Sequence, residues 1–135
     1  METQTVILTD NDYVVLRYLP EPKMLYHTIL KPVDEAVFKD VLDTGTNALK
    51  TYSIKRWLSD DRNNGPFSAE FMQWSLEDWI PRTIANGWKS WANVVPQDLM
   101  AAGTLVPIID KLYEYGLRMA VFTSVTQAMQ WLQKN

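Results

Sequence analysis

Residues 54–84, IKRWLSDDRNNGPFSAEFMQWSLEDWIPRTI, decide the fold class of this chain. Residues 54–59 predict a short buried strand, with Ile54, Trp57 and Leu58 as its apolar residues. The polar turn DDRNNG follows, and an aromatic-rich helix is expected to begin at Ser68, because serine is a common helix cap. Open α/β sheets bind their ligands beyond the carboxyl ends of the strands. The DDRNNG turn is therefore expected at the ligand-facing edge of a sheet.

The chain before this stretch predicts three strands and one helix. Residues 5–9 and 13–18 are β-branched and aromatic runs joined by Asp-Asn-Asp, a pattern typical of an antiparallel hairpin. Residues 24–30 predict a third strand. Apolar residues spaced near 3.6 then predict a helix that begins after Pro32 and ends near Lys50. A glycine at position 45 is expected to weaken the middle of this helix.

Strands and helices alternate in the rest of the chain. The expected elements are the helix from Ser68 to the stop signal at Asn86 and Gly87, a strand at 88–95, a helical turn at 97–102, a helix at 105–115, a strand at 117–122 and a last helix after Ser124. Such alternation implies a parallel sheet with right-handed crossovers. The sequence therefore predicts one α/β domain over residues 1–135, with a mixed, mostly parallel sheet, an N-terminal antiparallel hairpin and about four helices.

Composition excludes several classes of protein. Of the 135 residues, 47% are apolar and 21% are charged, which is ordinary for a globular domain. The net charge is −3 without any basic run, so nucleic acid is not an expected partner. No cysteine is present, which excludes disulfides and thiolate ligands. The N-terminal segment lacks the pattern of a signal peptide, and no apolar run is long enough for a membrane span, so we expect a cytoplasmic protein.

The sequence resembles one small bacterial family over almost its whole length. The segments that carry the likeness are MLYHTILKPVDEAVF, KRWLSD, WIPRTIANGW, NVVP and MAVFTSVTQAMQWL. They resemble the STAS-domain-like, SpoIIAA-like group, whose fold is that of anti-sigma-factor antagonists. The resemblance implies helices packed on a sheet of nearly sequential strand order, and a regulatory or interaction role without catalysis. In those antagonists a helix-capping serine is phosphorylated; Asp60 and Ser68 correspond loosely, but the tight serine-glycine motif is absent here.

Six polar residues are candidates for binding a ligand or a partner. Asp60, Asp61 and Arg62 have the charges to bind a cation, a phosphate or a charged partner, although such residues are also common in solvated turns. Ser68 begins a helix whose free amides suit an anion or phosphate. Gln97 and Ser124 follow predicted parallel strands, so they either line the same crevice or serve as plain helix caps.

Catalytic and metal-binding motifs are missing from the sequence. His27 is the only histidine and lies within a predicted strand, where a packed, hydrogen-bonded side chain is expected. No nucleophile elbow, glycine-rich phosphate loop or His-Glu metal motif occurs. We therefore expect a protein without catalytic activity, metal or cofactor.

The helix that begins at Ser68 has more apolar residues than one buried stripe requires. Its core-facing stripe is expected to consist of Met72, Leu76, Ile80 and Ile84. Phe71 and Trp74 lie outside that stripe, and Trp79 borders it. These aromatics are expected to form the interface of a two-fold homodimer or of a regulatory partner. The alternative is a pocket under this helix for a small apolar or lipid-like ligand.

Overall fold

The computed structural model describes residues 4–135. Residues 1–3, which belong to the N-terminal segment discussed above, lie outside the described residues. Six strands form one sheet in the order of the sequence: β1 (Val6–Asp10), β2 (Val14–Leu19), β3 (Met24–Ile29), β4 (Arg56–Asp60), β5 (Ser90–Val94) and β6 (Arg118–Phe122). The first three strands are antiparallel, and β3 to β6 are parallel. The predicted α/β fold with an N-terminal antiparallel hairpin is confirmed.

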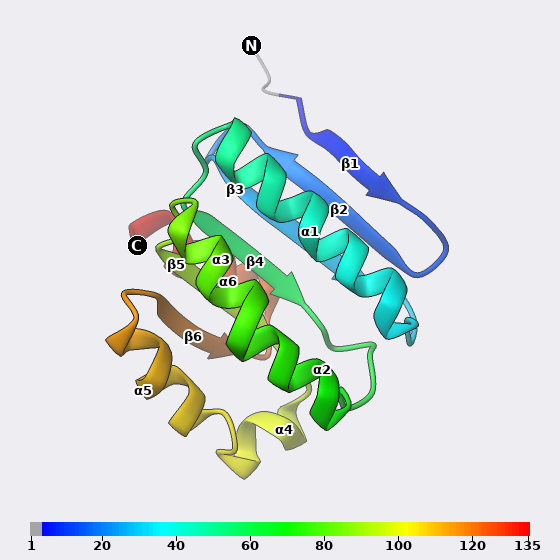
Figure 1. The fold of residues 1–135 in the computed structure, drawn as a ribbon, viewed down its shortest axis with the longest axis vertical. Coiled ribbons are helices and arrows are strands. Elements are labelled where there is room, and N and C mark those ends of the chain that lie inside the picture. Colours follow the sequence, from blue (N-terminus) through cyan, green and yellow to red (C-terminus); the bar gives the residue numbers. More distant parts are fainter. Residues whose placement is uncertain (1–3) are drawn as a thin grey trace.

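Helices cover both faces of this sheet (Figure 1). They are α1 (Glu35–Thr51), α2 (Ala69–Trp74), a π-helical turn η1 (Ser75–Trp79), α3 (Ile80–Ala85), α4 (Gln97–Ala102), α5 (Val106–Glu114) and α6 (Val125–Lys134). The segments α2, η1 and α3 are continuous and are called helix 69–85 below. Helix α6 packs behind β4, β5 and β6, whereas α1, helix 69–85 and α5 lie on the opposite face. The helical turn expected at 97–102 is α4, which makes five helical units.

Three of the described helices, α1, α2 and α6, begin at residues whose side chains accept from the free amides of the first turn. The Asp34 side chain accepts hydrogen bonds from the first turn of α1. Ser68 and Ser124 accept from the backbone amides of Phe71 and Gln127, at 3.0 and 3.3 Å. Side-chain caps of this kind contribute about 1 kcal/mol each. Among the described helices, none is long and apolar enough to cross a membrane.

The larger core lies between the sheet and α1 with helix 69–85. Its centre is a cluster of tryptophans, in which the rings of Trp57 and Trp79 meet edge to face with centroids 5.3 Å apart. Gly45 of α1 lies directly against the Trp57 ring, and a Cβ at that position would overlap the ring. The glycine that weakens the helix is thus required by the close approach of α1 to Trp57.

The buried stripe of helix 69–85 differs from the expected one. Its buried residues are Phe71, Ser75, Trp79, Ile80 and Thr83. Met72, Leu76 and Ile84 are only half-buried, so the expected stripe was wrong in three of its four members. The reason is η1, in which the Ile80 amide donates to the Ser75 carbonyl five residues earlier. A π-helical turn holds one extra residue, so it rotates the residues before it relative to those after it.

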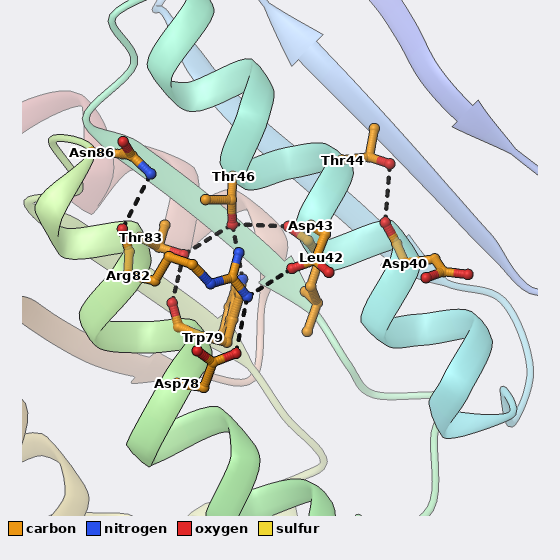
Figure 2. A network of polar contacts seen from close by, with 10 residues as sticks. All are labelled: Asp40, Leu42, Asp43, Thr44, Thr46, Asp78, Trp79, Arg82, Thr83 and Asn86. Atoms are coloured by element: carbon orange, nitrogen blue, oxygen red, sulfur yellow. Dashed lines mark hydrogen bonds and ion pairs between the residues drawn. The ribbon is translucent and has the colours of Figure 1, made fainter.

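A buried network joins α1 to helix 69–85 (Figure 2). The Trp79 indole N–H donates to the Thr46 hydroxyl at 3.0 Å, and the Thr46 hydroxyl lies 2.9 Å from that of Thr83. At the protein surface beside it, Arg82 donates to the carboxylates of Asp43 and Asp78, at 2.8 and 3.3 Å. These hydrogen bonds raise the pKa of the Arg82 guanidinium above its ordinary value. The network therefore fixes helix 69–85 against α1.

Replacing Thr46 with Val is predicted to lower the free energy of unfolding by about 1–3 kcal/mol. The substitution leaves the indole N–H of Trp79 buried without an acceptor, which costs roughly that amount. Urea denaturation followed by circular dichroism measures the change. The matched control is Thr44→Val, since the exposed Thr44 hydroxyl makes the same bond to a carbonyl four residues earlier. Equal losses in the two variants would contradict a role for the buried network.

Candidate functional site

Three polar side chains form a row across the middle of the sheet, on the face that helix 69–85 covers. His27 of β3 pairs with Ser59 of β4, and Ser59 pairs with Asn93 of β5. Paired residues of neighbouring strands point to the same face. Their exposed fractions are 1%, 0% and 8%. The three residues are called the polar row below.

Two buried tryptophans donate hydrogen bonds to two members of the polar row. Trp57 lies two residues before Ser59 on β4, and Trp91 lies two residues before Asn93 on β5. The Trp57 indole N–H donates to His27 Nδ1 at 3.0 Å, and that of Trp91 donates to Ser59 Oγ at 2.8 Å. In both cases an indole donates to the polar residue of the preceding strand. By the same pattern, the residue of β6 that pairs with Trp91 would donate to Asn93. That residue is Met119, whose side chain has no N–H. Within the described residues, Asn93 Oδ1 is accordingly buried without a hydrogen-bond partner.

The hydrogen bonds of His27 assign its tautomer. An indole nitrogen only donates, so the Nδ1 atom that accepts from Trp57 has no proton. The imidazole proton therefore lies on Nε2, which donates to Asp61 Oδ1 at 2.8 Å. This pair is a neutral imidazole bound to a carboxylate, and it fixes the Asp61 side chain. Both His27 nitrogens are occupied within the protein.

Ser59, His27 and Asp61 have the residue types of a catalytic triad but not its geometry. In a triad one imidazole nitrogen accepts the serine proton while the other donates to the carboxylate. Here Trp57 occupies the nitrogen that would accept from serine, and Ser59 Oγ instead accepts from Trp91. No group of three or more His, Asp or Glu side chains that could hold a metal occurs in residues 4–135.

A cavity of about 780 Å³ lies between the polar row and helix 69–85. This volume is within the range of small-molecule sites in proteins. Its walls are mainly apolar and include Phe38, Phe67, Phe71, Trp79, Trp91 and Leu105. The polar row, Asp61 and Ser75 supply polar groups, and Asp98 of α4 lies at an exposed position on the wall. None of the described lining residues is lysine or arginine.

The DDRNNG turn is divided between the two faces of the sheet. Asp61 lines the cavity, whereas Asp60 is the last residue of β4 and points to the face opposite Ser59. Both carboxylate oxygens of Asp60 accept from Arg62, at 2.9 Å from Nε and 2.8 Å from Nη2. These hydrogen bonds raise the pKa of the Arg62 guanidinium. Asp60 and Arg62 thus bind each other outside the cavity.

The helix caps predicted to bind ligand lie away from the cavity wall as well. Glu35 of α1 accepts from the backbone amide of Ser68 at 2.8 Å and from its hydroxyl at 2.6 Å, so a carboxylate already occupies this helix N-terminus. Gln97 is exposed at the start of α4. Ser124 caps α6, which packs on the opposite face. Of the six polar candidates, Asp61 is the one that lines the cavity.

The three aromatic candidates separate into two environments. Phe71 and Trp79 are 4% and 2% exposed within a single chain, and both line the cavity. Their predicted role at an interface with another chain stays a prediction. Trp74 is half-buried outside the cavity wall, and the Lys39 ammonium lies 4.9 Å from its ring centroid. A homodimer through Trp74 stays a prediction.

Sequence reasoning missed Asn93, the member of the polar row without a partner. The signal is a repeated spacing, because Trp-x-Ser at 57–59 and Trp-x-Asn at 91–93 occupy two strands that were expected to be parallel. Alternation places Trp57 and Ser59 on one face of their strand, and Trp91 and Asn93 on one face of theirs. The two tryptophans are thus brought into register beside two polar residues.

Replacing Asn93 with Leu is predicted to leave the free energy of unfolding unchanged or to raise it by about 1 kcal/mol. The substitution removes a buried oxygen without a partner and keeps a side chain of similar size. Asn64→Leu is the matched control on the same cavity wall, because Asn64 accepts from the Val33 amide and donates to the Gly65 carbonyl. This control is expected to lose about 1–2 kcal/mol in urea denaturation. A comparable loss in Asn93→Leu would show that Asn93 is needed for the fold.

Comparisons of the chain with family models, curated proteins and solved structures gave no match. The site is therefore interpreted from its own geometry.

Proposed function

We propose that this protein binds a small, largely apolar molecule in the cavity under helix 69–85 and does not transform it. The observation that carries the proposal is the cavity of about 780 Å³, whose mainly apolar wall ends in the polar row and Asp61. Asn93 of this wall has a buried Oδ1 atom without a partner among the described residues. An unpaired buried acceptor costs about 1–3 kcal/mol. Such groups are rare in folded proteins and concentrate where function requires them, which supports a functional role for this part of the wall.

The composition of the cavity supports a ligand-binding role. Small-molecule sites are typically apolar and aromatic, with a few fixed polar groups that orient the ligand. Phe71 and Trp79 supply aromatic surface from helix 69–85, and Trp91 supplies it from the sheet. Ser59 and His27 are held by indole donors at 2.8 and 3.0 Å, so the polar end is arranged before any ligand arrives. Preorganisation of this kind lowers the entropic cost of binding.

The irregular part of helix 69–85 also lies at the cavity. Ser75, Leu76 and Trp79 belong to η1 and line the cavity. Pro81 lies two residues after the end of η1 and has no N–H to donate to the preceding turn. π-helical turns are often found at functional sites. Here η1 brings Trp79 and Ile80 together onto the buried side of the helix.

A non-catalytic role is the simplest account of the polar groups. His27 is the only histidine of the chain, and its two nitrogens are engaged by Trp57 and Asp61. A general base needs a free nitrogen within reach of the substrate proton. Binding without reaction also agrees with the role implied by the STAS-like resemblance, whose membership we propose on the quoted segments and the six-stranded sheet.

The hypothesis that the protein is an interaction module is supported by fewer exposed aromatic residues than the sequence suggested. Phe71 and Trp79 were two of its three aromatic anchors, and both are buried within the chain. Trp74 is the remaining anchor for a homodimer or a regulatory partner. A regulatory role is compatible with ligand binding, since a partner can recognise whether the cavity is filled.

The neutral fluorophore N-phenyl-1-naphthylamine is predicted to bind this protein at one saturable site. Met72→Trp should weaken binding tenfold or more, because Met72 lines the cavity and a larger side chain would fill it. Gln73→Trp is the matched control, since Gln73 is exposed on the same helix and does not line the cavity. Isothermal titration calorimetry gives the affinity of each variant. Absence of saturable binding to the wild type, or equal binding by Met72→Trp, would overturn the proposed function.

A further inference from the structure

We infer that the ligand of this cavity carries a hydrogen-bond donor on an apolar body and no negative charge, as in an apolar amine, amide or alcohol. The inference rests on the proposed function and adds the chemical class of the ligand. It excludes fatty acids, sulfonates and phosphate esters as preferred occupants.

One acceptor on the cavity wall has unused capacity. Asp61 uses Oδ1 to accept from His27, while its Oδ2 makes no hydrogen bond to any residue in 4–135. A carboxylate oxygen only accepts hydrogen bonds. Asn93 Oδ1 also has no partner among the described residues, but protein atoms cover it, so a ligand in the cavity does not reach it. Asp61 Oδ2 therefore calls for a donor from the ligand.

The basic groups near the cavity are already engaged. None of the described lining residues is lysine or arginine. His27 is neutral, because protonation of Nδ1 would set two donors, the imidazole and the Trp57 indole, against each other. Arg62, the basic residue of the adjacent turn, binds both oxygens of Asp60 on the other face of the sheet. An anion in the cavity would meet no positive side chain.

The N-terminus of helix 69–85 is also occupied. Helix N-termini attract anions through their free amides and the helix dipole. At this helix the Glu35 carboxylate already accepts from the amide and the hydroxyl of Ser68. The remaining charges on the cavity wall, Asp61 and Asp98, are negative. An anionic ligand would thus lose its hydration beside the carboxylate of Asp61, whereas water screens the exposed Asp98.

Three probes with the same ring skeleton separate the donor from the charge. N-phenyl-1-naphthylamine has an N–H donor, 1-phenoxynaphthalene replaces that N–H by an ether oxygen, and 8-anilinonaphthalene-1-sulfonate adds an anion. Calorimetric titration of the wild type is expected to give the amine an affinity about fivefold or more above the ether. The sulfonate is expected to bind tenfold or more weakly than the amine.

Two variants assign these preferences to residues. Asp61→Asn should bring the affinity of the amine to that of the ether, because an N–H group replaces the free carboxylate oxygen. Asp61→Asn keeps an oxygen that accepts from His27 and removes the charge, so sulfonate affinity should rise several-fold. The matched control is Asp98→Asn, which removes a charge at an exposed lining position where water screens it.

The binding measurements test the exclusion of anions, the requirement for a donor and the proposed function separately. Sulfonate affinity equal to that of the amine, or unchanged by Asp61→Asn, would overturn the exclusion of anions and leave the proposed function standing. Ether affinity equal to that of the amine would overturn the requirement for a donor. Failure of all three probes to bind would overturn the proposed function and this inference with it.

Discussion

Two hydrogen bonds from buried indoles organise this structure. Trp57 and Trp91 lie in register on neighbouring parallel strands and donate to His27 and Ser59. A buried indole N–H needs an acceptor, so each tryptophan fixes the polar residue beside it. The same Trp57 ring requires the glycine at position 45, because a Cβ there would overlap it. The position of α1, and through Thr46 that of helix 69–85, follows from this packing.

The chemistry of the cavity is a consequence of the same pattern. Donation from Trp57 leaves the His27 proton on Nε2, and that proton holds Asp61 at the carboxyl end of the sheet. The series of indole donors stops at β6, where Met119 follows Trp91 and supplies no N–H. Asn93 is left with an unpaired oxygen that protein atoms cover, beside a cavity of about 780 Å³. The acceptor that a ligand donor would meet is the free oxygen of Asp61 on the cavity wall.

The parallel direction of the later strands could be predicted from the alternation of strands and helices, and the nearly sequential strand order was implied by the family resemblance. Ser68 and Ser124 could be predicted from the preference of serine for helix caps. The buried stripe of helix 69–85 could not, because a single π-helical turn at Ser75–Trp79 changes its register. The hydrogen bonds of Ser68 to Glu35 could not be predicted either, because Glu35 lies 33 residues away in the sequence and is brought to Ser68 only by tertiary packing. Asp60 and Asp61 are adjacent in sequence but lie on opposite faces of the sheet. Their separation follows from the end of β4 at Asp60, a boundary that was expected one residue earlier.

Trp57 holds His27 as a neutral imidazole with its proton on Nε2, and the chemistry of the cavity depends on this hydrogen bond. Long-range ¹H–¹⁵N correlation spectroscopy of the imidazole ring measures the position of the proton directly, and the single histidine of the chain makes the assignment unambiguous. The expected result is a protonated Nε2 and a nitrogen shift at Nδ1 typical of an unprotonated acceptor. A proton on Nδ1, or on both nitrogens, would contradict the hydrogen bond from Trp57 and place a different donor or a positive charge beside the cavity.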